Sequence, residues 1–211
     1  MFVMIRRALV KAEAVPAIEK GYQSNVAGPV LDSPGSRFCA VLLNADNPLE
    51  VRQMTGWDSR EACDRYLKEV YPAVWEEWNW VFDEPPAPSF WQINWPGKLM
   101  FNPLQAAGPN VYVRTSRFKL KPEGVAHVRN NFDEEVIDPV VRQPGNRFIF
   151  VLHSAEEERV GSQVTGWDSK EDCDNYLNNV FPEVFGKVKH VFEEPPIATF
   201  WNIKWPVIAN F

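Results

Sequence analysis

The sequence is a tandem duplication in which the second copy follows the first at an offset of 110 residues. The segment TGWDSREACDRYL from Thr55 returns as TGWDSKEDCDNYL from Thr165. Further along, VFDEPPAPSFWQINWP from Val81 returns as VFEEPPIATFWNIKWP from Val191. Over 96 aligned pairs, 39 are identical and no gap is needed. Whatever fold the first copy adopts, the second must adopt as well.

The length of the repeat predicts two complete domains. About 96 residues is too long for a solenoid repeat and close to the size of a small domain. We predict domains over 1–96 and 111–211, joined by a linker over 97–110. The linker, GKLMFNPLQAAGPN, is rich in Gly, Pro and Asn, which interrupt regular secondary structure.

Composition excludes several functional classes. The 211 residues carry a net charge of −6, with Lys and Arg scattered, so we expect neither nucleic acid nor a membrane surface as a partner. No apolar run reaches the length of a membrane span, and Arg6 and Arg7 interrupt the apolar N-terminus where a signal peptide would be uninterrupted. The three cysteines, Cys39, Cys63 and Cys173, lack CxxC spacing, which predicts a reducing, cytoplasmic location.

Each unit shows the element order β-α-β-β-α-β. Short apolar or β-branched runs predict strands, and apolar residues at three- and four-residue steps predict helices. In the first unit the predicted strands are Phe2–Val10, Arg37–Leu43, Val51–Trp57 and Phe90–Trp95, with helices over Val15–Val30 and from Asp58 or Ser59 onward. In the second unit the corresponding strands are Tyr112–Leu120, Arg147–His153 and Phe200–Trp205, and the first helix is Val125–Val140.

The second helix of each unit has recognisable signals at its start. Asp58 or Ser59 can cap its first N–H groups, and Glu61 lies where a capping box places its acid. Asp168, Ser169 and Glu171 repeat the arrangement. Pro72 and Pro182 then predict a break and a further short helix.

This order is that of the ferredoxin-like, split β-α-β fold, in the α+β class. One such unit covers one face of its sheet with helices and leaves the other face bare. Two units can bury their bare faces against each other. We therefore predict an intramolecular dimeric α+β barrel, a pseudo-dimer within one chain, and leave further self-association open.

A strand that runs into Trp-x-Ser before a helix with an early acid resembles the antibiotic-biosynthesis-monooxygenase-like (ABM) family. The residues are Trp57-Asp58-Ser59-Arg60-Glu61 and Trp167-Asp168-Ser169-Lys170-Glu171. The resemblance implies a pocket between sheet and helices in each unit, able to hold a flat aromatic molecule. Members of the family include cofactor-independent oxygenases of polycyclic phenols, haem-degrading oxygenases, isomerase-like enzymes and proteins without an assigned role.

The haem-degrading branch of that family fits poorly. Its members share an Asn on the first strand, a Trp in the second helix and a His ligand further along. The matching positions hold Ile5 or Arg6, Tyr66, and Trp75 or Glu76 in unit one, and Thr115 or Ser116, Tyr176, and Phe185 or Gly186 in unit two. Haem binding or degradation is therefore the least expected activity.

Three residues of the second unit are candidate catalytic groups. Tyr176 can donate to a substrate oxyanion, Arg117 can hold an enolate, and His153 can transfer a proton near neutral pH. All three histidines belong to this unit, and His153 ends a predicted strand. The alternatives are that Tyr176 packs in the core and that Arg117 pairs with Glu194 or faces water.

Candidate substrate-binding residues are Trp57, Tyr66 and Arg7 in unit one and Trp167 in unit two. The tryptophans can stack on a planar substrate, or else plug the junction between the third strand and the second helix. The alternatives for the other two residues are that Tyr66 packs in the core and that Arg7 pairs with Glu84 or faces water.

The tryptophans of WEEWNW, Trp75, Trp78 and Trp80, line a ligand cavity or fill the contact between units. We favour the contact, because Trp91 and Trp95 recur in the second copy.

No pair of histidines has metal-ligand spacing, and GxGxxG, P-loop and HExxH patterns are absent from the sequence, so we expect no metal and no cofactor.

Two functions from different classes remain. The first is a cofactor-independent monooxygenase-like enzyme acting on a small aromatic or phenolic molecule. The enzyme would orient the substrate, stabilise its phenolate and exclude water, while the substrate carbanion reduces dioxygen. The second is a ligand-binding or assembly protein of the same fold without chemistry, since fold alone does not determine function.

Overall fold

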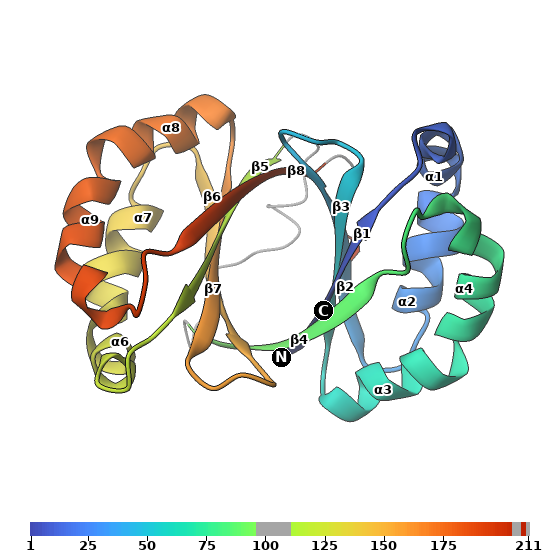
Figure 1. Ribbon diagram of the computed structural model, residues 1–211, viewed down its shortest axis with the longest axis horizontal. Coiled ribbons are helices and arrows are strands. Elements are labelled where there is room, and N and C mark those ends of the chain that lie inside the picture. The colour runs from blue at the N-terminus through green and yellow to red at the C-terminus, as the bar shows by residue number, and fades with distance from the viewer. Residues whose placement is uncertain (96–110, 204–207, 210–211) are drawn as a thin grey trace. The chain divides into compact units, whose positions relative to one another are not determined.

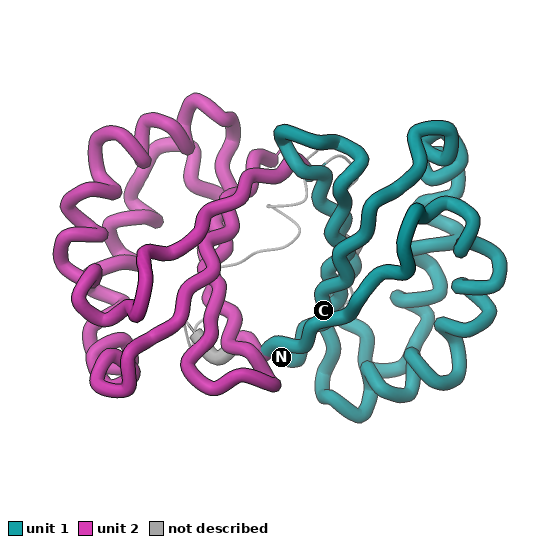
Figure 2. The backbone as a smooth tube through the Cα atoms, in the orientation of Figure 1, with its two compact units in different colours: residues 1–91, 203–211 teal, residues 92–202 magenta. Residues whose placement is uncertain are grey.

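The computed structural model describes residues 1–95, 111–203 and 208–209. The chain forms two compact units: unit one comprises Met1–Trp91 with Ile203–Phe211, and unit two comprises Gln92–Asn202 (Figure 2). The division thus falls within the last strand of the first repeat, upstream of the predicted linker. The short C-terminal strand β9 (Ile208–Ala209) belongs to unit one, where it pairs with Cys39 and Phe38.

Unit one has the predicted order of elements, with a helical layer over one face of its sheet (Figure 1). The elements are β1 (Phe2–Leu9), α1 (Val15–Gly21), α2 (Gly28–Leu31), β2 (Ser36–Asn44), β3 (Glu50–Trp57), α3 (Arg60–Glu69), α4 (Tyr71–Trp78) and β4 (Ala87–Trp95). Single 3₁₀ turns at Ala12–Ala14 and Asn79–Val81 lead into α1 and out of α4.

Unit two repeats this order. Its elements are β5 (Val111–Lys119), α6 (Gly124–Phe132), α7 (Asp138–Val141), β6 (Asn146–Ser154), β7 (Val160–Trp167), α8 (Lys170–Asn179), α9 (Phe181–Val188) and β8 (Ile197–Ile203). A 3₁₀ turn at Lys189–Val191 follows α9. The two β-α-β-β-α-β units predicted from the sequence are therefore confirmed.

The strand order within each unit is that of a split β-α-β fold. In unit one β3 lies between β1 and β2 and is antiparallel to both, while β4 flanks β1 on its other side. The corresponding order in unit two is β6-β7-β5-β8. Because successive side chains of a strand point to opposite faces, every second residue of β1 faces the helices. These are Phe2, Met4, Arg6 and Ala8, which appear with helix residues in one core and its adjoining cavity.

The first helix of each unit is interrupted by a π-helical turn, which the sequence analysis did not predict. In unit one this turn spans Tyr22–Ala27, and the N–H of Gly28 donates to the carbonyl of Gln23, five residues back. Asp133–Ile137 repeats it in unit two. A proline follows in each case, Pro29 and Pro139, whose ring clashes with the carbonyl four residues earlier and removes an N–H donor. Widening the turn relieves that clash.

The caps of α3 and α8 decide between the two candidates in the sequence. The hydroxyl of Ser59 accepts from the N–H of Ala62 at 3.3 Å, so Ser59 rather than Asp58 is the N-cap. The third helical position is then Ala62, and the carboxylate of Glu61, one residue earlier, bonds to the Ser59 hydroxyl, which lowers the pKa of Glu61. In unit two the third helical position holds Asp172, whose N–H donates to Ser169 Oγ at 3.1 Å while its carboxylate accepts from the same hydroxyl at 2.5 Å.

A glycine turn directly precedes β2 and β6 and contacts the residues that lead into each capped helix. Gly35 and Gly145 have φ of +84° and +73°, a region that residues with a Cβ rarely adopt. Each glycine carbonyl accepts from the N–H of the aspartate that ends the Trp-Asp pair, Asp58 at 2.8 Å and Asp168 at 2.7 Å. The repeated Pro-Gly and Trp-Asp-Ser motifs are therefore two halves of one local structure.

We predict that Ser169→Ala destabilises the protein by about 1–2 kcal/mol, because it removes both hydrogen bonds of the capping box. Ser59→Ala is the matched comparison and should cost a similar amount, because the Ser59 hydroxyl also caps an N–H and bonds to a carboxylate, that of Glu61. Denaturant unfolding monitored by tryptophan fluorescence measures both. An unchanged stability in either variant would contradict the assigned cap geometry.

Candidate functional site

A cavity of about 240 Å³ lies between the sheet and the helices of unit one. Its lining is mostly apolar, with a few polar groups. This volume is just below the range of about 300–1,000 Å³ usual for pockets that take drug-sized ligands. It therefore suits a small ligand. The lining residues are Arg6, Ala8, Val10, Val15, Ile18, Tyr22, Val26, Val41, Leu43, Pro48, Leu49, Val51, Gln53, Tyr66, Tyr71, Val74, Trp75, Trp78, Val81, Phe82 and Pro86.

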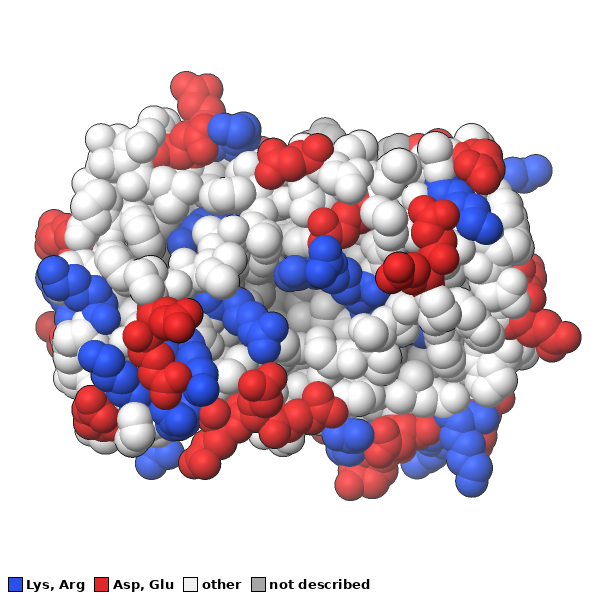
Figure 3. Space-filling view, in the orientation of Figure 1, with Lys and Arg blue, Asp and Glu red and all other residues white. Residues whose placement is uncertain are grey.

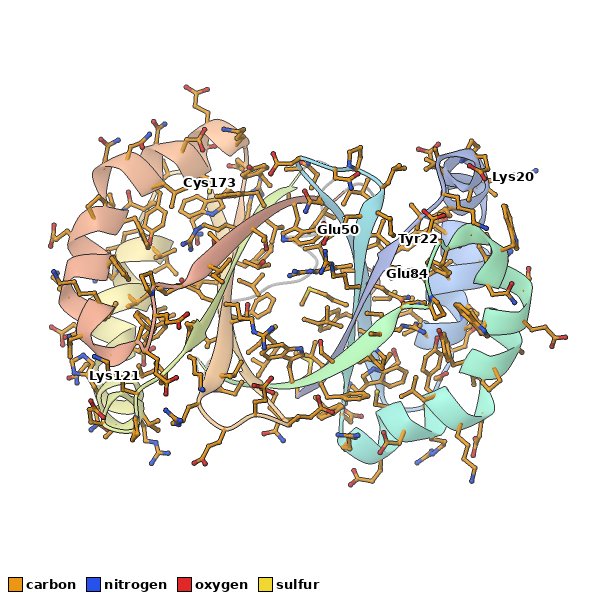
Figure 4. The ribbon with its side chains drawn as sticks, viewed as in Figure 1. Lys20, Tyr22, Glu50, Glu84, Lys121 and Cys173 are labelled. Carbon is orange, nitrogen blue, oxygen red and sulfur yellow. The ribbon has the colours of Figure 1, made fainter. Side chains whose placement is uncertain are left out.

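Strand register brings the polar groups of the cavity together. Arg6 on β1 lies directly opposite Gln53 on β3, and both side chains point toward the helices. Tyr66 comes from α3, on the same buried helix face as Cys63. Tyr22 comes from the π-helical turn and lies between the helical layer and the sheet (Figure 4). Four separate elements therefore supply the polar part of the lining.

Arg6 is the central group of this cluster. It is only 6% exposed, and its Nη2 donates to Gln53 Oε1 and to the hydroxyl of Tyr66 at 3.4 Å. Its guanidinium carbon lies 4.2 Å from the ring centroid of Tyr71, a cation–π contact. In the described part of the chain no carboxylate forms an ion pair with it. A buried cation without an anionic partner is costly, so this site favours a ligand that brings a negative charge.

The hydroxyls and thiol around Arg6 are neutral at physiological pH. Burial raises the pKa of Tyr66, although the positive charge of Arg6 opposes the change. Burial likewise raises the pKa of Tyr22 and of Cys39. Cys39 accepts weakly from Gln53 Nε2 at 3.6 Å and from the hydroxyl of Tyr22 at 4.0 Å. The cluster thus presents one cation and neutral donors.

Aromatic rings form a continuous series along the helix side of the cavity. Ring centroids are 5.1 Å apart for Trp57 and Tyr66, 6.2 Å for Tyr66 and Tyr71, and 6.2 Å for Tyr71 and Trp75. Trp75 then stacks on Phe82 at 5.8 Å with an angle of 13° between the rings. Such walls suit a flat aromatic ligand, which can stack on them.

The corresponding space in unit two has a volume of only about 30 Å³. One cross-strand pair accounts for much of the difference. Ala8 faces Val51 in unit one, whereas Phe118 faces Gly161 in unit two. A Cβ on Gly161 would lie 2.5 Å from the Phe118 ring, so that ring occupies the room that the glycine leaves. Phe118 also contacts Phe192 at 5.4 Å between centroids, which fills the space further.

Unit two also lacks several polar groups found in unit one. Its ring series runs through Trp167, Tyr176, Phe181 and Phe185, with neighbouring centroids 5.1, 6.1 and 5.5 Å apart. Phe181 and Phe185 replace Tyr71 and Trp75, which carry polar hydrogens. The packing of the aromatic series persists, while the hydroxyl of Tyr71 and the indole N–H of Trp75 have no counterpart in unit two.

The arginines predicted as site residues lie outside both cavities. Arg7 is exposed and pairs with Glu50 at 2.6 Å. Arg117 is exposed and pairs with Glu157 at 3.3 Å. Their carboxylate partners are therefore not Glu84 and Glu194, the alternatives offered by the sequence. Both point away from the helices, because they alternate with helix-facing residues.

The three predicted catalytic residues do not gather around one cavity. Tyr176 lines the small cavity of unit two, and burial raises its pKa to about 12. His153 is half-buried near the end of β6, where burial lowers its pKa, and it is absent from the described lining. Arg117 faces away from both.

Among the predicted substrate-binding residues, Tyr66 lies in the cavity lining of unit one. Trp57 and Trp167 are fully buried, and their Nε1 atoms donate to Thr55 and Thr165 at 2.9 and 3.0 Å. Their N–H groups are thus occupied within the protein, which agrees with the packing role offered as the alternative.

The sequence did not single out Arg6 and Gln53, which line the cavity of unit one. Alternation along β1 carried a signal for Arg6, because it is the one charged residue among the apolar side chains that face the helices. Trp75 and Trp78 line the cavity, the role that the sequence analysis did not favour, whereas Trp80 is 47% exposed. The side chains of Trp95 and Trp205 lie outside the described residues.

The surface carries charges of both signs. Basic and acidic side chains are interspersed on the face shown in Figure 3, as their scatter in the sequence predicts. No three His, Cys, Asp or Glu side chains in residues 1–95, 111–203 and 208–209 are placed to bind one metal ion. Within the same ranges, no helix is long and apolar enough to cross a membrane.

The fold is shared with solved structures of similar length. A "putative monooxygenase" from Lactobacillus acidophilus is 8% identical, with a TM-score of 0.70 over 100% of this chain and 99% of its own. A "putative monooxygenase" from Fusobacterium nucleatum is 8% identical, with a TM-score of 0.72 over 99% and 94%. An "anthrone oxidase-like protein" is 14% identical, with a TM-score of 0.65 over 99% and 92%.

These likenesses confirm, at the level of the fold, the resemblance predicted from the Trp-x-Ser motif. No protein-family model and no curated protein matches the chain.

We predict that stability falls as pH rises from about 9 to 11. Burial raises the pKa of Cys63 to about 12 and that of Cys173 to about 11, while an unfolded thiol titrates near pH 8.5. Between these values the unfolded chain releases protons that the folded chain keeps. Each thiol therefore lowers the unfolding free energy by up to about 1.4 kcal/mol per pH unit. Unfolding at pH 8 and pH 10 measures this, and Cys63→Ala and Cys173→Ala should each reduce the difference. A stability independent of pH across this range would contradict the assignment.

Proposed function

We propose that unit one binds a small, planar, phenol-like molecule and oxygenates it with dioxygen. The observation that carries the proposal is the buried guanidinium of Arg6, without an acidic partner among the described residues, in an aromatic-walled cavity of about 240 Å³. A phenolate or enolate supplies both the missing negative charge and a flat ring system for stacking.

The residues of the cavity restrict the substrate to molecules that ionise readily. The described lining contains no Asp, Glu or His to serve as a general base near neutral pH. Arg6 can instead lower the free energy of the anion once the proton has left, and Tyr66 can donate a hydrogen bond to its oxygen. A substrate acidified by conjugation meets this requirement, whereas an ordinary alcohol or alkane does not.

The proposed reaction needs no electrons from the protein. The substrate carbanion reduces dioxygen, one oxygen atom forms a new C=O bond at a CH₂ carbon, and the other leaves as water with the two hydrogens removed. Substrate plus O₂ therefore balances oxidised product plus H₂O. The protein orients the anion, stabilises its charge and excludes bulk water.

Structural neighbours named as monooxygenases and as an anthrone oxidase-like protein support this reaction class. Identities of 8–14% show a shared fold only, so the argument for chemistry depends on Arg6 and the rings around it.

We also propose, from the duplication, that the bare sheet faces of the two units pair to form the intramolecular α+β barrel, and that the protein functions in the cytoplasm.

A binding protein without chemistry is the second candidate. It is favoured by the absence of a titratable base from the described lining, since binding needs only the cation and the rings. Haem binding fits less well, because the cavity is small and none of its described lining residues is a His.

The test compares Arg6→Met with Arg7→Met. Arg6 lies in the cavity, and Arg7 is its exposed neighbour on the other face of β1. The two variants therefore remove the same charge at adjacent positions of the strand. With 1-naphthol and anthrone as probes, we expect Arg6→Met to weaken binding of the anion and to lower oxygen uptake by at least about 100-fold. Arg7→Met should leave both within about twofold. Melting temperatures confirm that both variants fold.

Three outcomes are informative. Oxygen uptake that depends on Arg6, with incorporation of ¹⁸O from ¹⁸O₂ into product, supports the enzyme. Binding that depends on Arg6 without any oxygen uptake favours the non-catalytic candidate. Equal behaviour of the two variants would overturn the assignment of the cavity.

We further predict one ligand per chain, because Phe118 fills the corresponding space in unit two. The double variant Phe118→Ala/Gly161→Val restores the cross-strand pair of unit one and should allow a second, weaker molecule to bind. Isothermal titration with 1-naphthol measures the stoichiometry. Two ligands bound to the unmodified chain would show that unit two is not closed.

A further inference from the structure

We propose that unit two contains a buried binding site for one small inorganic anion of halide size. Ser116, Gln163 and Tyr176 line the cavity of about 30 Å³, and Arg114 lies next to it, hydrogen-bonded to Ser116 and close to the ring of Phe181. It is separate from the cavity of unit one and does not depend on the function proposed above.

Strand register places three of these groups on one face of the sheet. Arg114 and Ser116 alternate along β5, and Gln163 on β7 lies directly opposite Ser116. Tyr176 comes from α8, one turn after Cys173, which Figure 4 shows between that helix and the sheet. All four residues are less than 10% exposed: Arg114 3%, Ser116 3%, Gln163 8% and Tyr176 2%.

Arg114 is a buried cation without an anionic partner. Its Nη2 donates to Ser116 Oγ at 3.4 Å, which directs the guanidinium along the strand toward the cavity lining. Its guanidinium carbon lies 5.0 Å from the ring centroid of Phe181, another lining residue. Its Nε has no hydrogen-bond partner, and no carboxylate among the described residues pairs with it. A water molecule could satisfy the donor, but only an anion balances the charge.

Gln163 supplies a second unsatisfied donor. Its Nε2 is buried and has no hydrogen-bond partner among the described residues. The counterpart in unit one, Gln53, accepts from Arg6 and donates to Cys39. Ser116 and Ile149 replace those two partners in unit two, so the same amide is left facing the small cavity.

The size and polarity of the space select the ligand. A volume of about 30 Å³ admits one species of roughly the size of a water molecule. The described lining offers the amide N–H of Gln163 and the hydroxyls of Ser116 and Tyr176, and it contains no Asp or Glu. The guanidinium of Arg114 lies next to this lining, hydrogen-bonded to Ser116. The other lining residues are apolar or aromatic, which excludes a hydrated cation. Chloride meets these conditions, and bromide is a close substitute that X-ray scattering can identify.

The experiment measures thermal stability against chloride concentration. Ionic strength is held constant with sodium gluconate, whose anion is too large for the cavity. A ligand that binds only the folded protein raises the melting temperature with the logarithm of its concentration above Kd. We expect this rise for the unmodified chain and for Arg6→Met, which changes only unit one. Arg114→Met should abolish it, and methionine fits there because Met4 occupies the equivalent buried position.

Gln163→Leu provides a second variant that keeps the arginine. Loss of one hydrogen bond should weaken the apparent chloride affinity by about tenfold without abolishing it. Bromide-soaked crystals give the direct readout, an anomalous peak within hydrogen-bond distance of Arg114. An equal response of the unmodified chain and Arg114→Met to chloride would overturn the proposal. A water molecule in place of the bromide peak would overturn it as well.

Discussion

A buried guanidinium on the helix-facing side of the first strand is the constraint on which both units depend. Unit one places it at Arg6 and unit two at Arg114, whose counterpart in unit one is Met4. The positions differ by two residues along the strand, so both face the helices. In each unit an aromatic ring of the helical layer contacts the cation, Tyr71 at 4.2 Å and Phe181 at 5.0 Å. Cation–π contacts offset part of the free-energy cost of burying the guanidinium, and a bound anion can offset the rest.

The two units show how a duplicated fold can change its site without changing its frame. Strand order, π-helical turns, glycine turns and serine caps recur in both copies, since each is determined by local residues that both copies keep. The cavity differs because a single cross-strand pair, Ala8 with Val51 against Phe118 with Gly161, moves an aromatic ring into the space. Close packing makes such an exchange decisive, because a phenyl ring fills most of a small pocket.

Local signals account for the elements that were predicted correctly. The Pro-Gly turns, the Ser N-caps and the helical spacing of apolar residues act over a few residues, so their structural effect can be inferred from the chain alone. The π-helical turns were missed although Pro29 and Pro139 marked their positions, because a proline can equally end a helix or kink it. Asp58 and Ser59 both have the chemistry of a cap, so the sequence left the N-cap open between them, and the structure assigns it to Ser59.

For the cavity of unit one, the sequence indicated residue types better than positions. Tyr66, predicted because it shares a helix face with Cys63, lies in the lining. Arg7, the predicted arginine, is exposed, whereas its neighbour Arg6 lies in the lining, because a step of one residue reverses the face of a strand. The preference for unit two followed from its histidines, whereas cavity volume depends on side chains from several elements at once.

The sequence by itself therefore determined the duplication, the β-α-β-β-α-β order and the local turns and caps, because these follow from identity between copies and from interactions among near neighbours. Only the tertiary structure decided which arginines are buried, which unit has the larger cavity and which polar groups line it. Those outcomes depend on strand register and on the packing of residues 40 to 60 positions apart, such as Arg6 with Gln53 and Tyr66. Spacing along the chain does not encode such contacts until the strands and helices are brought together.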